Sequence, residues 1–471
     1  MNSDIPHKVQ GLVIREYAKL HGLILGLSQT ELLLESREQA LKMLEDKKTQ
    51  DVVFYSSQIF LQNNDYYLLK KILERGCRLH FALEEKRIES LSELESFFKF
   101  GVPEKFKKSE IRFNDLSYAH HDRSEVLSRI DRILSSGKIL NSNEINDLEG
   151  DFNNYFGFGT KTIAVSSGTG ALVMGLLALG INPGDEVILP CVSWISTAHA
   201  VSFIGAVPVF ADVNRKLSIS IDSCKKLITN KTKAVIAVHF LGKVASEIEE
   251  LKSFCDQGKL LLIEDSSQGF GAFKEDKKVG SFGAISCISL NPMKTLGGVG
   301  EAGIITTRDE RIHQECLKLR YCGLEDKKNS SRVSLNFRMD AIQAAIISYN
   351  LSVFSEKRIH LKALYKRYVE LLKSHIEYID EDKNEELAYY GFSIFSDKRE
   401  MLISYLNDFG IETKIQHEPL MSEQTSYQDC VRDDLIAQKM IKQVLTLPLH
   451  FKMSLDNVDY ICSKIKGFLK Q

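Results

Sequence analysis

The feature that most constrains the fold is an alternation of short apolar strands and helices between about residues 124 and 350. The predicted strands are apolar almost throughout, which is typical of a sheet that helices cover on both faces. We therefore predict an α/β fold. The predicted strands are 162–165, 186–189, 207–210, 234–238, 260–264, 284–289 and 303–306, and the clearest helices between them are 170–179, 195–204 and 246–257.

Composition narrows the class of protein. The 471 residues are 44% hydrophobic and 26% charged, enough for a large core and for more than one domain. Lys and Arg number 61 against 63 Asp and Glu, so the net charge is -2. Such a balance argues against broad electrostatic binding to nucleic acid or to an anionic membrane.

Cysteine usage and the start of the chain indicate the compartment. The nine Cys are dispersed and form no Cys-x-x-Cys pair, so we predict no metal site and reduced thiols in a cytoplasm. The first residues lack the basic and apolar regions of a signal peptide. The apolar stretch 164–181 holds several Gly, Ser and Thr, and a buried strand, turn and helix explain it better than membrane insertion.

Three domains are predicted. Residues 1–110 form a small α/β accessory domain, in which a strand at 51–55, a helix at 65–75 and a strand at 77–83 suggest a parallel pair with a right-handed crossover. Residues 111–350 form the large domain. Residues 351–471, which begin with a long helix at 354–375, form a smaller C-terminal α/β lobe.

Four polar clusters follow predicted strands, where open α/β sheets bind ligands. The first is SSGTGAL (166–172), a turn of small residues before a helix. Free backbone N–H groups and the helix dipole make such a turn an anion site, to which Thr169 adds a hydroxyl. The alternative is an ordinary N-cap.

The second cluster, PCVSWIS (190–196), contains Trp194, the single Trp of the chain. An aromatic side chain at a strand end can stack on a planar heterocycle, worth very roughly 1 kcal/mol, although it can equally belong to the core. The third cluster, LLIEDSSQG (261–269), ends an apolar strand in Asp265, with Gln268 three residues on. A carboxylate at a buried strand end needs a cation or a donor, unless it only caps a helix.

The fourth cluster, SLNPMKTLGG (289–298), places Lys294 in a Gly-rich turn, apart from any run of charges. A desolvated Lys has a lowered pKa and can form a Schiff base with an aldehyde, whereas an ordinary loop Lys is solvated. In chain order the clusters offer an anion turn, a stacking aromatic residue, a strand-end Asp and a Lys. Together they predict a pyridoxal 5′-phosphate pocket.

Residues 124–465 resemble the sugar aminotransferases of the DegT/DnrJ/EryC1/StrS family, which are pyridoxal phosphate-dependent transferases of fold type I, like aspartate aminotransferase. The supporting stretches span nearly the whole region: SSGTGAL (166–172), GDEVILPCVSWISTAHAV (184–201), GAVPVFADV (205–213), VHFLG (238–242), LLIEDSSQGFGA (261–272), SLNPMKTLGG (289–298), LNFRMDAIQAA (335–345) and GIETK (410–414).

The resemblance implies a role for each site residue. Lys294 would carry the cofactor and shuttle protons, and Asp265 would keep the ring nitrogen protonated. Gln268 would meet the ring hydroxyl and Trp194 would stack on the ring. The phosphate would be held by Gly168, Thr169, Gly170 and Ser289, together with Asn336 of the neighbouring subunit.

A functional homodimer with shared active sites follows from that role of Asn336. The implied reaction moves an amino group from L-glutamate to a keto- or aldehydo-sugar, a nucleotide sugar or an acidic sugar, in bacterial surface polysaccharide or lipopolysaccharide biosynthesis. Where the family commonly has Ala-Ala the chain has Ser266 and Ser267, and Cys322 stands where His is frequent. We expect these departures to lie on the substrate side.

Two alternatives remain open. A pyridoxamine phosphate-dependent sugar dehydratase of this family would replace the Lys by His, whereas Lys294 is present. A non-catalytic, cofactor-binding accessory protein would not need the complete set of Asp265, Gln268 and Lys294. The N-terminal domain resembles an uncharacterised protein of sporadic carbohydrate gene clusters in VQGLVIREYAKLHGL (9–23) and GCRLHFALE (76–84), which suggests a binding or scaffolding role.

Overall fold

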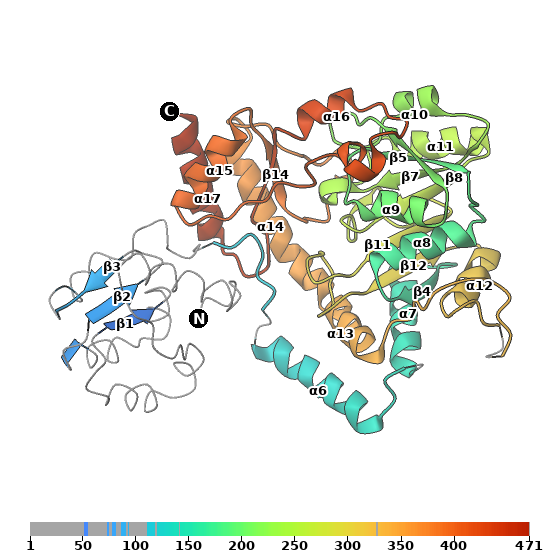
Figure 1. The fold of residues 1–471 in the computed structure, drawn as a ribbon, viewed down its shortest axis with the longest axis horizontal. Helices are drawn as coiled ribbons and strands as arrows, with labels where there is room; N and C mark the ends of the chain where they lie inside the picture. Colours follow the sequence, from blue (N-terminus) through green and yellow to red (C-terminus); the bar gives the residue numbers. More distant parts are fainter. Residues whose placement is uncertain are drawn as a thin grey trace. The chain divides into compact units, whose positions relative to one another are not determined.

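The computed structural model describes residues 51–54, 73–74, 78–81, 86–90, 93, 111–117, 120–140, 142–325 and 328–470. The chain divides into two compact units, Met1–Glu110 and Ile111–Gln471. Figure 1 shows both. A further division near residue 350 stays a prediction.

The first unit contains a small three-stranded sheet. Its strands β1 (Asp51–Phe54) and β2 (Arg78–Phe81) are parallel, as predicted, and β3 (Lys86–Ile88) runs antiparallel to β2. Leu79 and Ile88 are buried. Most of the helix predicted at 65–75 and all of the stretch 9–23 lie outside the described residues.

The second unit is built on a seven-stranded sheet in the order β4-β12-β11-β8-β7-β5-β6. All seven predicted strands are present, and β12 alone among them runs antiparallel to its neighbours, β11 and β4. The bounds are β4 Lys161–Val165, β5 Glu186–Pro190, β6 Val207–Ala211, β7 Thr232–Val238, β8 Leu261–Asp265, β11 Ile285–Ser289 and β12 Gly303–Thr307.

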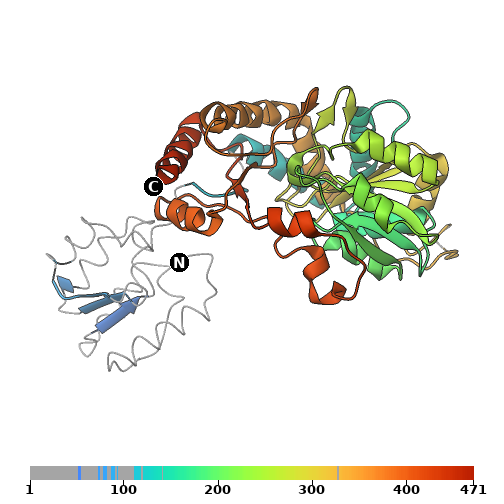
Figure 2. The ribbon, with the colours of Figure 1, turned by 90° about the horizontal axis from the view of Figure 1, so that it is seen from above.

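Helices cover both faces of this sheet, as Figures 1 and 2 show. Along β5, Val187 and Leu189 belong to one hydrophobic cluster and Ile188 to another, because successive strand side chains point to opposite faces. The predicted sandwich of a sheet between helices is therefore confirmed. The helices are α7 Asn143–Phe156, α8 Gly168–Ala178, α9 Ser196–Phe203, α10 Ile221–Leu227, α11 Ile248–Gly258, α12 Glu310–Leu319 and α13 Ala341–Ser352.

The C-terminal part packs around a core of its own. The long helix α14 (Phe354–Leu372) packs on α17 (Leu455–Leu469), beside the antiparallel pair β14 (Phe392–Phe395) and β15 (Val444–Leu447). The remaining described elements are α6 His120–Ser136, α15 Arg399–Asp408, α16 Leu435–Met440, and the two-residue strands β9 Phe273–Lys274, β10 Lys277–Lys278 and β13 Glu385–Glu386.

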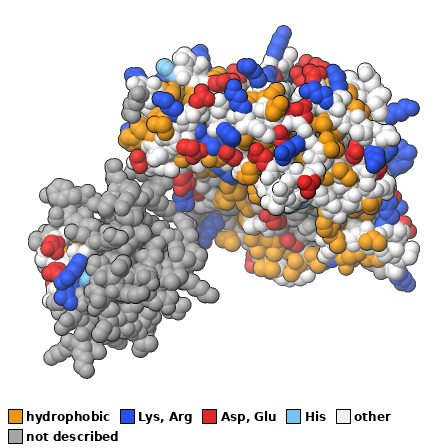
Figure 3. Space-filling model, turned by 45° about the horizontal axis from the view of Figure 1, so that its top comes forward, with side chains coloured by type: hydrophobic (Ala, Val, Ile, Leu, Met, Phe, Trp, Pro, Cys, Tyr) orange, Lys and Arg blue, Asp and Glu red, His pale blue; other side chains and the backbone are white. Residues whose placement is uncertain are grey.

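The surface agrees with the near-neutral composition. Figure 3 shows basic and acidic side chains interspersed over the visible face of the second unit. None of the helices in the described part of the chain combines the length and the apolar character needed to cross a membrane.

Candidate active site

Asp265 is the last residue of β8 and is 4% exposed. The Thr197 hydroxyl donates a hydrogen bond of 2.8 Å to its Oδ2, and the backbone N–H of Ser267 donates one of 3.2 Å to its Oδ1. Thr197 Oγ1 also lies 2.9 Å from Ser193 Oγ. Since the single Thr197 proton is used on the carboxylate, Ser193 donates to Thr197. This chain of hydroxyls fixes the orientation of the carboxylate.

The adjacent carboxylate, Glu264, points to the other face of the sheet. It accepts hydrogen bonds from the backbone N–H groups of Gly280, Phe282 and Gly283 at 2.7–2.8 Å. His239 Nε2 lies 3.0 Å from it, and the Ala245 N–H donates to His239 Nδ1. The His239 proton is therefore on Nε2 and is donated to Glu264. Both carboxylate oxygens of Glu264 therefore accept hydrogen bonds from the protein itself, and of the two carboxylates it is Asp265 that can meet a ligand.

Gln268 is held from two sides. Its Oε1 accepts a hydrogen bond of 2.8 Å from the Leu241 N–H, and its Nε2 lies 2.8 Å from His417 Nε2. The His417 ring is 5.7 Å from the Trp194 ring and 5.5 Å from the Phe240 ring, centroid to centroid. Sequence reasoning missed His417, because it reaches Gln268 from 149 residues away and stands in no motif.

Lys294 lies in the loop after β11, where its backbone N–H donates to the Asn291 carbonyl. Burial lowers the pKa of its amine, and so does the charge of Lys414, against the opposing effect of the Asp265 and Glu301 carboxylates. The Nζ is 5.8 Å from the centroid of the Tyr390 ring. The structure therefore gives Lys294 the environment of a reactive amine rather than of a solvated loop Lys.

The turn of small residues meets the end of β11. A Cβ on Gly168 would lie 2.5 Å from Ser289 Cβ, so only glycine permits this approach. Ser167 caps α8 by accepting a hydrogen bond of 3.0 Å from the Gly170 N–H. The N-cap alternative is thus correct for Ser167, while Gly168 brings Ser289 to the start of the same helix.

Thr169, Gly170 and Asn336 line one cavity of about 570 Å³. Asn336 Oδ1 accepts hydrogen bonds from the backbone N–H and the Nε of Arg338, both at 3.2 Å, which directs its amide. The Trp194 side chain is 59% exposed and the cavity is open, so both are available to a ligand or to another chain.

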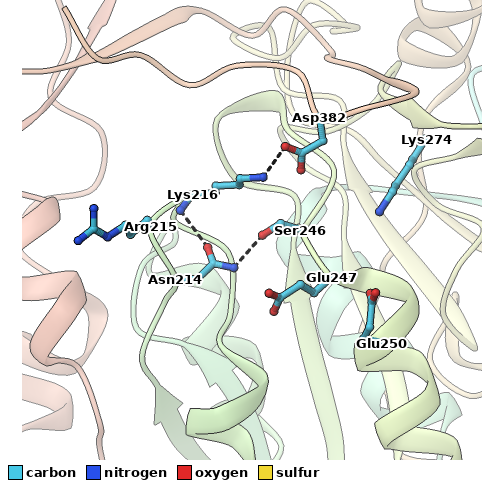
Figure 4. A pocket seen from close by; sticks show the side chains of 8 residues that line it. All are labelled: Asn214, Arg215, Lys216, Ser246, Glu247, Glu250, Lys274 and Asp382. Atoms are coloured by element: carbon cyan, nitrogen blue, oxygen red, sulfur yellow. Dashed lines mark hydrogen bonds and ion pairs between the residues drawn. The ribbon is translucent and has the colours of Figure 1, made fainter.

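A second hollow, of about 430 Å³, is drawn in Figure 4 and contains none of the predicted site residues. Lys216 makes an ion pair with Asp382 across it, and Glu247 and Glu250 lie at the start of α11. Acidic side chains at a helix N-terminus are explained by the helix dipole. The ion pair and the helix dipole thus explain the charges of Lys216, Asp382, Glu247 and Glu250.

Ser266 corrects one expectation. Its side chain is fully buried and its hydroxyl is 2.8 Å from Ser286 Oγ, so it faces the interior and not a substrate. The hydroxyl is tolerated because a second hydroxyl pairs with it inside the sheet layer.

Comparisons with known proteins identify the family of the chain. The sequence profile of the DegT/DnrJ/EryC1/StrS aminotransferase family matches residues 120–466. The 3-oxo-glucose-6-phosphate:glutamate aminotransferase of Bacillus subtilis is 30% identical over 365 residues, 74% of this chain and 80% of that protein. The UDP-2-acetamido-2-deoxy-3-oxo-D-glucuronate aminotransferase of Pseudomonas aeruginosa is 27% identical over 347 residues, 73% and 96% of the two chains.

A solved Bacillus subtilis structure with bound cofactor PMP superposes with a TM-score of 0.72 at 29% identity, and the match covers 78% of this chain and 87% of that one. The fold is that of the pyridoxal phosphate-dependent transferases of fold type I. The profile match and the similarity to these proteins show that the chain belongs to the DegT/DnrJ/EryC1/StrS aminotransferase family and is a pyridoxal 5′-phosphate-dependent enzyme.

Proposed function

We propose that the enzyme transfers an amino group from L-glutamate to the keto or aldehyde carbon of a sugar. The acceptor is a nucleotide sugar or an acidic sugar, and the aminated product serves bacterial surface polysaccharide synthesis in the cytoplasm. One observation carries the proposal: the buried Asp265 carboxylate and the Lys294 amine, whose pKa is lowered, lie at the same edge of the sheet. The names of the two aminotransferase relatives support a 3-oxo sugar as the acceptor.

The residues present fit pyridoxal phosphate. Asp265 is a buried carboxylate directed by Thr197, and such a group suits a protonated ring nitrogen. The contact of Gly168 with Ser289 leaves a glycine-lined helix start and a hydroxyl, which suit a phosphate. When bound, the cofactor supplies a carbonyl that amines add to and a ring that accepts an electron pair.

The protein's own part of the reaction is proton transfer and orientation. Lys294 removes the proton from Cα of the amino donor and later returns a proton to the carbon of the sugar that receives the nitrogen. Its lowered pKa increases the fraction of neutral amine, which is the form that can accept a proton. Overall, L-glutamate and a keto-sugar become 2-oxoglutarate and an amino-sugar.

The roles proposed for the other site residues are those that the family resemblance implies. Gln268 and Trp194 would hold the ring, and Gly168, Thr169, Gly170 and Ser289 the phosphate. Asn336 would act on the phosphate of a neighbouring subunit in a homodimer. Two large apolar side chains beside Asn336 support a subunit contact, since Phe203 is 66% exposed and Leu335 is 51% exposed.

Transfer of label from L-[15N]glutamate tests the reaction. Purified enzyme with pyridoxal phosphate and a 3-oxo nucleotide sugar is expected to place 15N on the sugar and to release 2-oxoglutarate in equal amount. Lys294→Ala is expected to abolish both products while the protein stays folded. Formation of 2-oxoglutarate without a labelled sugar, across a panel of keto- and aldehydo-sugars, would contradict the proposed acceptor class.

Mixing two inactive variants tests the shared site. In a homodimer of Lys294→Ala and Asn336→Ala chains, one active site combines an intact Lys294 with an intact Asn336 of the other chain. Co-refolded chains are therefore expected to regain activity that neither variant has alone. No recovery, although sedimentation shows a dimer, would mean that Asn336 serves the site of its own chain.

The two alternative functions give different outcomes. A sugar dehydratase would release water and transfer no nitrogen to the sugar. The presence of Lys294, where such a dehydratase would have His, argues against this alternative. An accessory protein would leave the output of its pathway unchanged in cells that carry Lys294→Ala.

A further inference from the structure

We propose that His417 is a positioning residue that orients the Gln268 amide, so that Gln268 presents an N–H donor to the cofactor. The inference rests on the proposed role of Gln268 beside the cofactor's ring hydroxyl and adds a residue that, together with the Leu241 N–H, determines which end of the amide faces that oxygen. His417 acts through Gln268 and not on the reacting atoms.

Backbone geometry assigns the two ends of the amide. The Leu241 N–H can only donate, so the Gln268 atom 2.8 Å from it must be the oxygen. The nitrogen end then lies 2.8 Å from His417 Nε2. One of its two protons is used there, and the other stays available for a ligand.

The same contact assigns the protonation state of His417. Gln268 Nε2 can only donate, so His417 Nε2 must be the unprotonated, accepting nitrogen of a neutral imidazole. The proton is therefore on Nδ1. Burial lowers the pKa of His417 to about 3, and the charges of Lys294 and Lys414 act in the same direction, so the ring remains an acceptor at neutral pH.

The surrounding chain keeps the ring in place. Two backbone hydrogen bonds join Lys414 to Thr446 on β15, three residues before His417, and the Glu418 carboxylate pairs with Arg399 at 2.6 Å. His417 itself has a φ of 58°, in the left-handed region that is uncommon for residues other than Gly and in which Asn, Asp and His are the most frequent exceptions. Anchors on both sides hold this conformation, which aims the ring between Trp194 and Phe240.

Without His417, the Leu241 N–H alone would hold the amide in this orientation, and an orientation that offers a competing acceptor would be less strongly disfavoured. A Gln268 oxygen facing the cofactor's oxygen would repel it, whereas an N–H stabilises negative charge there. His417 thus links the C-terminal segment to the electronic state of the cofactor. A role in packing alone would require only a ring of similar size.

Two substitutions separate positioning from packing. His417→Phe keeps a ring and removes the acceptor, while His417→Asn keeps an acceptor and tolerates a positive φ. The single Trp of the chain, Trp194, lies beside His417 and gives a fluorescence signal for binding. Quenching of that signal by pyridoxal phosphate, added to apo-enzyme without donor or sugar, measures cofactor affinity independently of transfer.

We expect His417→Phe to weaken cofactor binding about tenfold and His417→Asn to stay within about threefold of the wild type. In a Gln268→Leu background His417→Phe should weaken cofactor binding less than about twofold, because there is no amide left to orient. Far-UV circular dichroism and thermal unfolding verify that each variant is folded. The proposal would be overturned if His417→Phe lowered cofactor affinity equally with and without Gln268, or if it left cofactor affinity unchanged.

Nitrogen-15 NMR of the wild-type apo-enzyme gives a second test, which does not rely on the affinity of any variant. The proposal requires a neutral His417 protonated on Nδ1 at pH 7, identified by the loss of its signals in His417→Asn. A proton on Nε2, or a charged ring, would overturn it. Both tests omit the sugar, so a failed transfer assay would leave their results intact.

Discussion

The Thr197 hydroxyl donates a hydrogen bond of 2.8 Å to the Asp265 carboxylate, and it joins the helix that follows β5 to the end of β8. Ser193 donates to the same Thr197 oxygen. Burying a carboxylate without a hydrogen-bond donor would destabilise the folded protein. These two hydroxyls therefore allow Asp265 to be buried in the site.

Thr197→Val tests this role of the Thr197 hydroxyl. The substitution keeps the shape of the side chain and removes the donor, so the free energy of unfolding is expected to fall by about 1–3 kcal/mol. Cofactor affinity should fall as well, because the carboxylate loses its orientation. Denaturant titration and Trp194 fluorescence measure the two effects.

Thr446→Val is the matched control. Thr446 is also buried, and its hydroxyl is 2.9 Å from Ser393 in the core of the C-terminal part. Its loss should lower stability by a similar amount and leave cofactor affinity unchanged. Equal effects of the two variants on cofactor affinity would contradict a specific role for Thr197.

Gly168→Ala tests the contact between the helix start and β11. The added Cβ would lie 2.5 Å from Ser289 Cβ and 3.0 Å from its Cα, so the backbone must move apart. Overpacking of this kind costs about 1–3 kcal/mol and should also impair phosphate binding.

Gly150→Ala supplies the comparison for that substitution. Gly150 lies within α7, and apart from its chain neighbours and the backbone of its own helix no atom lies within 4 Å of the position of its Cβ. Replacing glycine inside a helix is expected to stabilise the protein by about 0.5–1 kcal/mol. A loss of stability in Gly150→Ala as large as that in Gly168→Ala would mean that the close approach is not the cause.

The pH dependence of stability reports on His417. Burial, reinforced by Lys294 and Lys414, lowers its pKa from 6.5 to about 3 in the folded protein. Below pH 6.5 the unfolded chain therefore binds a proton that the folded chain does not, and the free energy of unfolding falls as pH decreases toward 3. His417→Asn should reduce this slope, measured by urea titrations between pH 7 and pH 4. An identical slope in the wild type and the variant would contradict a neutral, buried His417.

Lys243 connects the segment after β7 to the C-terminal part. It is 1% exposed, pairs with Glu385 and lies 3.3 Å from Asp382, close in sequence to Leu241, the donor to Gln268. Glu385→Ala would leave a buried charge without its main partner, and we expect a loss of about 3–5 kcal/mol in the free energy of unfolding. Asp222→Ala breaks an exposed pair with Lys225 and should cost less than about 1 kcal/mol. Similar losses in both variants would contradict the importance of burial.

Much of the large sheet could be predicted, because each buried strand is a continuous apolar run bounded by turn residues. The turn at 166–170 and the end of β8 were recognisable for the same reason, since a polar residue directly after such a run falls at the ligand-binding edge. The choice of Asp265 over Glu264 depended on Gln268 three residues on and on the family resemblance, because the apolar run itself does not show which face of the strand each carboxylate occupies.

Contacts between residues far apart in the chain could not be predicted from the sequence. His417 meets Gln268 across 149 residues, and Lys243 pairs with Glu385 across 142. Neither has a periodic or motif signal. Ser266 departs from the Ala common in the family, and the prediction that this departure lies on the substrate side is wrong, because Ser286 on the neighbouring strand pairs with its hydroxyl in the interior.

The most direct test of the account is the visible absorption spectrum of the purified protein with pyridoxal phosphate, before and after the addition of L-glutamate. We expect a yellow band that L-glutamate bleaches and that a suitable keto-sugar restores, and we expect no such band in Lys294→Ala. A protein that stays colourless with added pyridoxal phosphate, or a band that persists in Lys294→Ala, would contradict the assignment of Lys294 as the residue that carries the cofactor.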